Sequence, residues 1–420
     1  MVPKGWKRVP IKDVCESIID CVNKTAPVVE YETPFKMIRT TNVRNGRVNT
    51  EDVRYVTEDT YLQWVRRGKP QVGDIIFTRE APVGEAGVLQ DAEGIFLGQR
   101  TMMYRADTCL SDNYFLFYSL SSPFCQKQIE DFSNGGTVAH MRVPDCGEIL
   151  INLPPFLEQK KIAQILSTWD KAISVTEKLL TNSQQQKKAL MQQLLTGKKR
   201  LLDENEVRFS GKWNSCLVSD YFDVGSSKRV LQENWQTEGV PFYRTRELVS
   251  LSRNEPFRSE IFISDELFFE ISQKYQTPKS GDFLVSGVGT LGIHYQVKSG
   301  DKFYFKDGNV LWFKLKDGID SDYFKYCFQS DFIQDQIKAQ ASITTVGTYT
   351  IQNAKKTKFL CPPTFEEQQK IAAVLSAADA EISILKKKLT CLKDEKKALM
   401  QQLLTGKRRV KVDAEEAVSA

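Results

Sequence analysis

The stretch KKALMQQLLTGK occurs at residues 187–198 and again, unchanged, at residues 396–407. An offset of 209 aligns the surrounding segments as well, and 24 of the 40 residues from 161 to 200 are identical to those from 370 to 409. A repeat of this strength sets the architecture before any local pattern is considered. The chain is therefore built from two tandem copies of one plan.

Both copies of the repeat carry the start and stop signals of a long helix. They open on a proline pair followed by acidic residues, in PPFLEQKKIA from residue 154 and PPTFEEQQKIA from residue 362. Proline and acidic side chains suit the first turn of a helix. Both copies close on Leu-Leu-Thr-Gly-Lys, where Gly197 and Gly406 are placed to end a helix in the left-handed conformation. We expect helices over residues 153–197 and 362–406.

Apolar side chains recur in steps of four and three along both predicted helices, which is the pattern of a coiled-coil seam. The seam residues are Ile162, Leu166, Trp169, Ile173, Leu180, Leu190 and Leu194 in the first copy, and Ile371, Leu375, Ile382, Leu385, Leu389, Leu392, Leu399 and Leu403 in the second. A helix of about 36 residues is roughly 54 Å long, so each must pair along its length, and we expect the two to pair with each other. Lys187 and Lys396 occupy seam positions, where they either fix the register or extend their charges to solvent.

The segments ahead of the two helices are weaker copies of each other. PFKMIRTTNV from residue 34 matches PFYRTRELVS from residue 241, and VGDIIFTREAPVGEAGVL from residue 72 matches SGDFLVSGVGTLGIHYQV from residue 280. Short runs rich in Ile, Phe, Val and Tyr, broken by Gly, Asp and Asn, predict strands and turns with one or two helices. The predicted fold is α+β, with two similar mixed α/β domains in tandem, separated by two long antiparallel coiled-coil helices and related by pseudo-twofold symmetry.

The same signals give the predicted boundaries. We expect a first domain over residues 1–152, a central helix over 153–197, a linker and second domain over 198–361, a C-terminal helix over 362–406 and a tail over 407–420.

Composition is that of an ordinary globular protein. Of the 420 residues, 41% are hydrophobic and the formal net charge is +5, which permits a nucleic-acid partner without requiring one. The sequence shows neither a secretion signal nor a membrane span, so we expect a soluble, cytoplasmic protein with no membrane partner. Nine scattered cysteines with no CxxC pair, and only two histidines, predict free thiols and no metal site.

Two short motifs suggest chemistry, and their context argues against it. GVGTLG at residues 287–292 fits a phosphate-binding fingerprint, but the next segment, IHYQV, alternates like a strand instead of opening a helix, so we predict a turn or bulge. INLPPF at residues 151–156 has a superficial likeness to the Asn-Pro-Pro-aromatic loop of adenine methyltransferases, but a leucine separates Asn152 from the prolines. His140 and His294 occupy different places in the two copies, which favours structural or surface roles. We therefore predict a non-catalytic chain.

The remaining feature is the repetition of shape. Two similar, diverged domains with a helical spacer suit a bipartite duplex DNA site, because dimeric readers match their symmetry to half-sites about one helical turn apart. Nearly identical helices would offer similar docking surfaces to two copies of one partner. A non-enzymatic coiled-coil scaffold whose end domains bind proteins explains the same pattern and stays open.

These features together resemble the specificity subunit of type I restriction-modification systems. The resemblance covers essentially the whole chain and rests on the paired helix openings, the two KKALMQQLLTGK endings, FLGQRTMMYR from residue 96, GGTVAHMRV from residue 135, VPFYRTRELVSL from residue 240 and TPKSGDFLVSGVGTLG from residue 277. It implies two target-recognition domains, each reading one half of a split double-stranded DNA site. It also implies helices that set the spacer and dock methyltransferase subunits, two of them by the symmetry of the chain.

The resemblance further implies that catalysis belongs to other chains. Methyltransferase subunits use S-adenosylmethionine to modify adenine, and motor-nuclease restriction subunits use ATP with Mg, so this chain is expected to bind no cofactor.

Base reading depends on side chains that can pair with base edges, and arginine suits guanine while glutamine and asparagine suit adenine. The candidate DNA-binding residues are Arg39, Thr41, Arg44, Arg79, Gln99, Arg100 and Arg142 in the first domain, and Arg244, Arg246, Ser286, Lys306 and Thr345 in the second.

Overall fold

The computed structural model describes residues 2–133, 139–253, 255–306, 308–341 and 347–412. The chain forms two compact units. Unit 1 comprises Met1–Lys178 with Lys386–Ala420, and unit 2 comprises Leu179–Leu385. The longest helices, α5 (Phe156–Leu194) and α12 (Phe365–Leu403), each contribute to both units. This division therefore differs from the predicted one, which separated the helices from the domains.

Unit 1 contains domain 1, the part that precedes α5. Its strands form a two-stranded sheet, a four-stranded sheet in the order β2-β10-β7-β8, a three-stranded sheet in the order β6-β3-β9 and a small hairpin. The strands are β1 (Lys7–Pro10), β2 (Cys15–Asp20), β3 (Lys36–Ile38), β4 (Val43–Arg44), β5 (Arg47–Val48), β6 (Arg54–Tyr55), β7 (Ile75–Arg79), β8 (Val83–Val88), β9 (Ile95–Leu97), β10 (Thr101–Ala106) and β11 (Leu150–Leu153). The α-helices are α1 (Glu58–Trp64), α2 (Asn113–Leu120), α3 (Pro123–Ser133) and α4 (Val143–Gly147), with 3-10 turns at Ile11–Val14, Thr40–Asn42 and Val65–Arg67.

Unit 2 contains domain 2, the part between α5 and α12, and its sheets follow the same plan. The four-stranded sheet has the order β13-β19-β16-β17, the three-stranded sheet the order β15-β14-β18, and β12 pairs with β20. The strands are β12 (Asn214–Leu217), β13 (Phe222–Gly225), β14 (Val240–Tyr243), β15 (Phe262–Ile263), β16 (Phe283–Ser286), β17 (His294–Gln296), β18 (Tyr304–Phe305), β19 (Val310–Leu315) and β20 (Lys358–Cys361). The α-helices are α6 (Val218–Tyr221), α7 (Thr245–Ser252), α8 (Asp265–Tyr275), α9 (Ser321–Gln329), α10 (Asp331–Ala341) and α11 (Ile351–Lys356), with a 3-10 turn at Gln232–Asn234.

The two domains share one topology, which confirms the prediction of two similar mixed α/β domains. In each three-stranded sheet one pair is parallel, β3 with β9 and β14 with β18, whereas all pairs in the four-stranded sheets are antiparallel. The GVGTLG motif forms the connection between β16 and β17, as the turn prediction required. INLPPF forms the end of β11 and the lead-in to α5.

Each domain core is completed by residues of both long helices. In unit 1, Ile162 and Leu166 of α5 and Leu403 of α12 are buried in the same cluster as Phe115 of α2. In unit 2, Leu194, Ile371 and Leu375 are buried with Phe222, Phe283 and Phe324. Burial of apolar surface is the main source of folding free energy, so neither domain core is complete without its helix segments.

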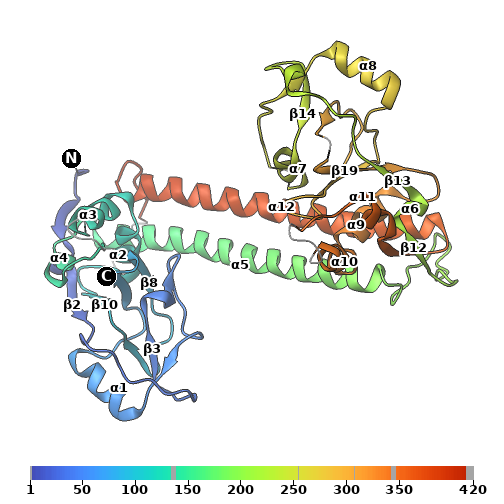
Figure 1. Ribbon diagram of the computed structural model, residues 1–420. Coiled ribbons are helices and arrows are strands. Elements are labelled where there is room, and N and C mark those ends of the chain that lie inside the picture. The colour runs from blue at the N-terminus through green and yellow to red at the C-terminus, as the bar shows by residue number, and fades with distance from the viewer. Residues whose placement is uncertain (1, 134–138, 254, 307, 342–346, 413–420) are drawn as a thin grey trace. The chain divides into compact units, whose positions relative to one another are not determined.

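In each unit the segments of α5 and α12 lie side by side and run antiparallel (Figure 1). Unit 1 joins Asp170 to Lys396 at 2.6 Å and Glu177 to Lys393 at 2.9 Å. Unit 2 joins Lys187 to Asp379 at 2.6 Å, and Ser183 donates to Glu381 at 3.0 Å. In both pairings the residue number rises on one helix as it falls on the other.

The predicted seam faces inward along both helices. Every seam residue is buried or partly buried, while most residues between them are exposed. Gly197 and Gly406 have φ values of 69° and 66°, as predicted for glycines that end a helix. Both helices are a few residues shorter than predicted, because the proline pairs precede the first turn and hydrogen-bonded turns, not helix, lead to these glycines.

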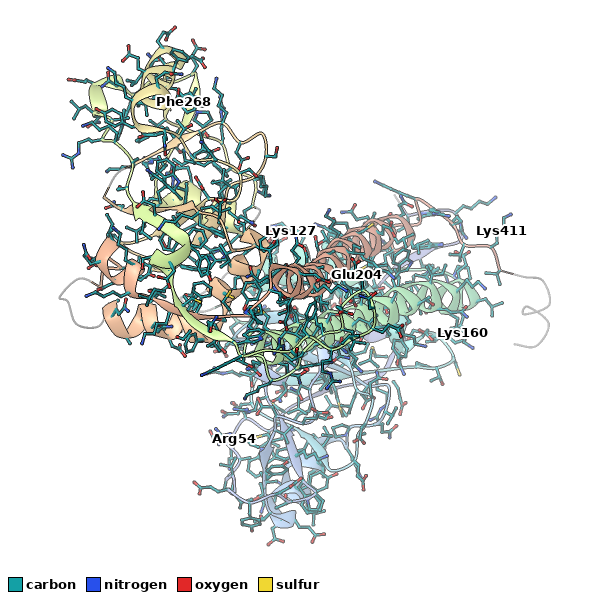
Figure 2. The ribbon with its side chains drawn as sticks, turned by 90° about the vertical axis from the view of Figure 1, so that its right-hand side faces the viewer. Arg54, Lys127, Lys160, Glu204, Phe268 and Lys411 are labelled. Carbon is teal, nitrogen blue, oxygen red and sulfur yellow. The ribbon has the colours of Figure 1, made fainter. Side chains whose placement is uncertain are left out.

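Each domain has a part near its own helix segments and a distal part. The distal part of domain 1 contains β6, marked by Arg54 in Figure 2, and that of domain 2 contains α8, marked by Phe268. The three-stranded sheet lies in the distal part, and its strand β9 or β18 is followed directly along the chain by a strand of the four-stranded sheet, β10 or β19.

Candidate nucleic-acid interface

Both domains present polar side chains at the same place, the carboxyl ends of the parallel strand pair. In domain 1 the Gly98 amide donates to the Ile38 carbonyl at 2.8 Å, and in domain 2 the Lys306 amide donates to the Tyr243 carbonyl at 2.8 Å. Arg39 and Arg244 are therefore structural equivalents, each following the first strand of its pair. The polar loops that continue from these strands are the candidate interface.

In domain 1 this rim carries Arg39, Thr41, Gln99 and Arg100. The Arg39 amide donates to the Asn42 side chain at 3.0 Å, and Asn42 is buried, so the turn is fixed. Thr41, Gln99 and Arg100 are exposed. Arg100 has a left-handed φ of 70° and an ion pair with Glu80 at 3.3 Å. The structure thus brings four predicted residues together on one rim.

Three other predicted arginines of domain 1 are engaged elsewhere. Arg79 is 9% exposed, pairs with Asp20 at 3.0 Å and donates to the Met141 carbonyl at 3.1 Å. Arg44 donates to two backbone carbonyls of its own turn, at 2.6 and 2.8 Å. Arg142 is exposed but forms a bidentate pair with Asp145, which follows it in the same short segment. Burial removes Arg79 from the candidate surface, because a side chain enclosed by its own partners offers nothing to a ligand.

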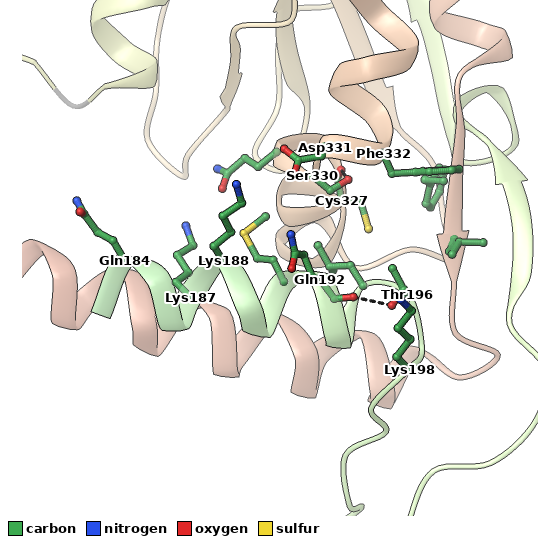
Figure 3. Close-up of a pocket in the computed structure, with 15 residues that line it drawn as sticks. Gln184, Lys187, Lys188, Gln192, Thr196, Lys198, Cys327, Ser330, Asp331 and Phe332 are labelled. Atoms are coloured by element: carbon green, nitrogen blue, oxygen red, sulfur yellow. Dashed lines mark hydrogen bonds between the residues drawn. The ribbon is translucent and has the colours of Figure 1, made fainter. Parts of the chain in front are cut away.

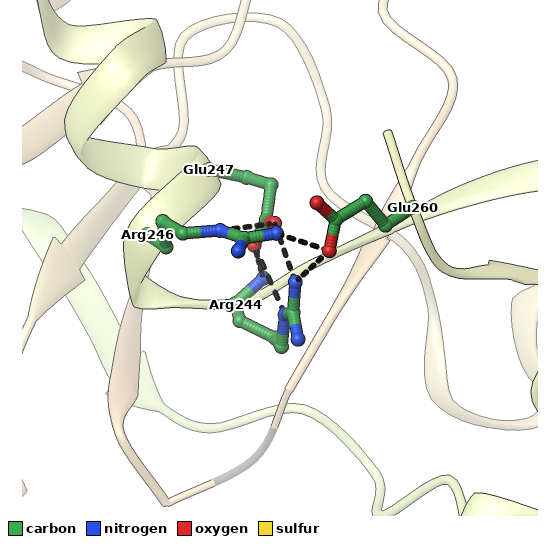
Figure 4. A network of polar contacts seen from close by, with 4 residues as sticks. All are labelled: Arg244, Arg246, Glu247 and Glu260. Carbon is green, nitrogen blue, oxygen red and sulfur yellow. Dashed lines mark hydrogen bonds and ion pairs between the residues drawn. The ribbon is translucent and has the colours of Figure 1, made fainter. Parts of the chain in front are cut away.

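In domain 2 the equivalent rim is a network of two arginines and two glutamates (Figure 4). Glu247, in the first turn of α7, accepts from the Arg244 amide at 2.9 Å and from the Arg244 guanidinium at 2.8 Å. Arg246 donates to Glu247 at 2.9 Å and to Glu260 at 2.5 Å. Arg246 and Glu260 are each 61% exposed, whereas Glu247 is 3% exposed. Both predicted arginines therefore lie together at the surface.

Glu247 stays ionised far into the acid range. Burial alone would raise the pKa of its carboxyl group, but hydrogen bonds from Arg244, its backbone amide and Arg246 outweigh that effect and lower the pKa from 4.5 to about 2. The network therefore keeps its charges at any physiological pH.

Lys306 and Asn309 close the other side of this rim. Together with Arg244, Thr245 and Arg246 they line a shallow recess of about 240 Å³. The predicted residue Ser286 does not reach it, since Ser286 is fully buried and its hydroxyl donates to the Thr290 carbonyl at 2.5 Å to hold its own loop. Because Ser286 is buried, we remove it from the candidate DNA-binding residues. Thr345 lies outside the described residues.

The histidines have the roles that the sequence favoured. The His140 side chain is 46% exposed and lies 3.6 Å from Glu80. The ring of His294 packs against Phe328, with ring centroids 5.0 Å apart, and burial lowers its pKa to about 4.

The helices carry a second repeated feature, a Tyr–Asp–Lys group in each unit. In unit 2, Lys187 pairs with Asp379 and lies over the Tyr326 ring, 5.3 Å from its centroid, while the Tyr326 hydroxyl donates to Asp379 at 2.9 Å. In unit 1, Lys396, Asp170 and Tyr118 form the same group, again with 5.3 Å between the lysine and the ring centroid. The two seam lysines are therefore paired inside the helix junction and do not extend to solvent.

Beside this group in unit 2 lies a groove of about 570 Å³ (Figure 3). One wall is the end of α5, with Lys188, Met191 and Leu195, and the other comes from α9, α10 and β20, with Phe332 and Leu360. Phe332 is 49% exposed. The groove is thus apolar at its base, with Lys187, Lys188 and Lys198 around it.

The same position in unit 1 is covered by an arginine. In unit 1, strand pairing places Arg8 opposite Asn152. The equivalent pair in unit 2 is Ser215 opposite Leu360. Arg8 donates to Asn152 at 3.1 Å and lies over the ring of Phe124, the counterpart of Phe332, at 4.8 Å. Replacement of an Arg–Asn pair by Ser–Leu explains why the aromatic side chain is exposed in unit 2 only.

Sequence reasoning missed the acidic and amide partners of the predicted arginines. Asn42, Glu247 and Glu260 orient Arg39, Arg244 and Arg246, and none of the three was predicted. One signal was available, because an Asn or Glu three residues after an Arg suits the first turn of a helix. Glu260 is 14 residues from Arg246 and has no such local signal.

Other kinds of site are not found in the described part of the chain. Among those residues, no group of three or more His, Cys, Asp or Glu side chains is arranged to hold a metal ion. No described helix is both long and apolar enough to cross a membrane. All nine cysteines are free thiols.

With this geometry in place, comparisons with known proteins decide the family. The model of the type I restriction modification DNA specificity domain matches residues 3–182 and again residues 211–394. This chain belongs to that family. The two matches correspond to the two copies of the repeat, each ending within one of the long helices.

Relatives in the specificity family match either nearly the whole chain or a part of it. The chain is 24% identical over 433 residues to the type I restriction enzyme MjaVIII specificity subunit of Methanocaldococcus jannaschii, covering 98% of this chain and 94% of that one. It is 24% identical over 177 residues to the EcoKI specificity subunit of Escherichia coli K12, covering 40% of this chain and 36% of that one.

Solved structures of the family share the fold. The S subunit of a type I restriction-modification system from M. genitalium superposes with a TM-score of 0.61 at 18% identity, covering 96% of both chains. A structure of a type I R-M system described for its complex assembly and conformational transition superposes with a TM-score of 0.52 at 16% identity, covering 96% of this chain and 98% of that one.

Proposed function

We propose that this chain is the DNA sequence-specificity subunit of a type I restriction-modification complex, in which each domain binds one half of a bipartite duplex site. The observation that carries the proposal is the contrast between the rims and the helices. The rims occupy equivalent positions but differ in side chains, with Arg39 and Asn42 in one domain and Arg244 and Glu247 in the other. The helix ends are identical in sequence over twelve residues. Unlike rims suit unlike half-sites, and like helices suit two copies of one partner.

The proposed DNA contacts are the exposed and partly exposed residues of the two rims, together with Arg142, which is exposed elsewhere in domain 1. In domain 1 these are Arg39, Thr41, Gln99, Arg100 and Arg142, and in domain 2 they are Arg244, Arg246 and Lys306. Side chains with paired donors can read base edges in the major groove, and the remaining cations position the duplex through phosphates.

We propose that α5 and α12 set the spacer between the half-sites. Each helix is continuous over 39 residues and contributes to the cores of both units. Because a helix rises about 1.5 Å per residue, a change in helix length changes the separation that the protein favours.

The partner subunits supply the chemistry in this proposal. Methyltransferase subunits, two per chain, would bring S-adenosylmethionine, and motor-nuclease restriction subunits would bring the sites for ATP and Mg. This chain then acts without a catalytic residue or cofactor of its own, in the cytoplasm where the DNA lies.

The two methyltransferase subunits would dock on the repeated helix ends, and the groove of unit 2 would be part of one docking surface. Its apolar base suits an apolar side chain of the partner, and Lys188 and Lys198 on its rim suit acidic residues around that side chain. Because Arg8 covers the equivalent position in unit 1, we expect the partner at unit 2 to bind more tightly.

Closing the groove tests this docking surface. The double substitution Ser215→Arg and Leu360→Asn recreates in unit 2 the pair that Arg8 and Asn152 form in unit 1. We expect it to weaken the tighter of two methyltransferase binding steps about tenfold, measured by titration with analytical ultracentrifugation. The control Arg8→Ser should leave that step unchanged. Unaltered binding in the double variant would exclude the groove from the docking surface.

Binding to randomised duplexes tests the DNA-reading function itself. The assembled complex should select two short sequences separated by a fixed number of unspecified base pairs, with an affinity that falls steeply as salt rises. A protein-binding scaffold would show neither the sequence preference nor the steep salt dependence, and that result would overturn the proposal.

A further inference from the structure

The network of Arg244, Arg246, Glu247 and Glu260 leaves one side of each guanidinium group available. In both arginines the contacts to the glutamates use Nε and Nη2. Among the described residues, no hydrogen bond or ion pair engages Nη1 of either arginine. In each arginine Nη2 donates to both Glu247 and Glu260, so the carboxylates hold Nε and Nη2, and the Nη1 hydrogens remain as donors beside the recess of domain 2.

The charges in this network determine which ligand it suits. The two carboxylates cancel the two guanidinium groups, and Glu260 lies at the surface beside Arg246. A phosphate placed on Arg246 would stand close to that carboxylate, and like charges at such a distance repel. A guanine edge carries two neutral acceptors, N7 and O6, to which the free Nη1 hydrogens can donate without adding charge.

The carboxylates also reduce the entropy lost on binding. An unpaired arginine on a surface samples many rotamers, and fixing it costs free energy when a ligand binds. Arg246 is held by two carboxylates from two segments, the first turn of α7 and the strand lead-in at Glu260. The guanidinium group of Arg246, with its free Nη1 donors, is therefore positioned before DNA arrives.

Domain 1 lacks this arrangement. Its counterpart of Glu247 is Asn42, whose side chain accepts from the Arg39 amide but carries no charge. A phosphate would meet no carboxylate at that turn. The turns at Arg39 and Arg244 thus differ in charge, although Arg100 on the rim of domain 1 pairs with Glu80.

We propose that Glu247 and Glu260 are positioning residues that orient Arg244 and Arg246 toward the acceptor edge of guanine, so that the half-site bound by domain 2 contains a G read by Arg246. This inference rests on the proposed DNA-reading function and specifies its chemistry at one site.

The test compares three variants of the full chain in complex with its methyltransferase subunit. Each complex is used to select from randomised duplexes, and its affinity for the selected site is then measured over a range of salt concentrations. Arg246→Lys keeps the charge and removes the guanidinium group, and Glu260→Gln keeps the shape of the side chain and removes the carboxylate charge. Lys306→Gln removes a cation that pairs with no carboxylate among the described residues. Arg246 and Glu260 are largely exposed, so their substitution leaves the core intact.

We expect Arg246→Lys to lower discrimination at one G·C pair of one half-site by about tenfold to a hundredfold while the salt dependence stays the same. Glu260→Gln should lower discrimination at the same pair and strengthen binding to unrelated duplexes. Lys306→Gln should weaken binding to all duplexes alike and reduce the logarithmic salt slope by about one.

Two results would overturn the inference and leave the proposed function intact. One is a wild-type bipartite site in which Arg246→Lys changes no base preference. The other is full discrimination with a reduced salt slope when a fourth variant, Arg246→Ala, is measured in the same way, which identifies a phosphate contact. A wild-type complex with no sequence preference at all would instead overturn the proposed function.

Discussion

Arg200 and Arg409 each join three segments of their own unit. In unit 2, Arg200 pairs with the buried carboxylate of Glu367 at 2.5 Å, donates to the Gly211 carbonyl at 2.9 Å and lies over the Trp213 ring. In unit 1, Arg409 pairs with Glu158, donates to the Lys4 carbonyl at 3.0 Å and lies over the Trp6 ring. The arginine after each KKALMQQLLTGK stretch therefore ties the end of one helix to the start of the other and to the segment that enters the domain.

At the scale of single residues, acid should weaken unit 2 through Glu247. A carboxyl group with a depressed pKa stabilises the fold fully above its ordinary value of 4.5, and this contribution is lost as the pH falls toward about 2. We expect the free energy of unfolding of the wild-type chain to fall over this range by more than that of Glu247→Gln. Urea unfolding at pH 6, 4 and 3 measures the difference. Parallel curves for the two proteins would contradict the proposed charge network.

The sequence suggests residue types that could read DNA, but it does not show which of these residues are accessible at the surface. Arg79 is buried because Asp20, from a strand 59 positions earlier, pairs with it, and Ser286 is buried because its hydroxyl holds its own loop. The Arg79 partnership depends on tertiary structure, to which a single sequence gives no guide, whereas the Ser286 bond to Thr290 lies within one loop whose conformation the sequence did not reveal. Arg244 and Arg246 lie together because they are near neighbours in the sequence, and their role in DNA binding stays a prediction.

At the scale of elements, the Tyr–Asp–Lys groups set the register of the helix pair. A lysine in an apolar seam is unfavourable unless it is paired, and only one register brings Lys187 to Asp379 and Lys396 to Asp170. The same group occurs in both units with the same contacts, so each unit specifies its pairing independently.

A double-mutant cycle measures this contribution. Lys187→Met and Asp379→Asn should each destabilise the chain, and the double variant should lose less than the sum, with a coupling energy of about 1 kcal/mol because Asp379 is partly exposed. Thermal unfolding of the four proteins gives the value. Strict additivity would show that the pair does not select the register.

The helices are the elements that the sequence predicts best. Seam periodicity, proline pairs and terminal glycines are local signals, and they locate α5 and α12 to within a few residues. The short strands are less clear, since β5, β6 and β15 have only two residues each and form because of their partners.

At the scale of the whole molecule, each compact unit takes part of both long helices. Leu403 of α12 is buried with Ile162 of α5 in the core of unit 1, and Leu194 is buried with Ile371 in that of unit 2. Periodicity shows that these positions are apolar, but it does not show which core they enter. The sequence therefore predicts the two domains and the two helices. It does not predict that part of each helix belongs to the core of each compact unit.

The proposed function makes the helices a determinant of the DNA spacer, and a change in their length tests that claim most directly. The boundary between the units crosses α5 after Lys178 and α12 after Leu385. Four residues inserted at both points lengthen each helix by about 6 Å and turn it by about 40° beyond a full turn. In B-DNA the added length of about 6 Å corresponds to about two base pairs. The added rotation of about 40° corresponds to about one base pair.

Selection from randomised duplexes by the complex that carries both insertions gives the result. We predict that both half-site sequences stay as in the wild-type complex and that the interval between them grows by one to two base pairs. An unchanged interval, in a complex that still binds both half-sites, would contradict the claim that these helices set the spacing.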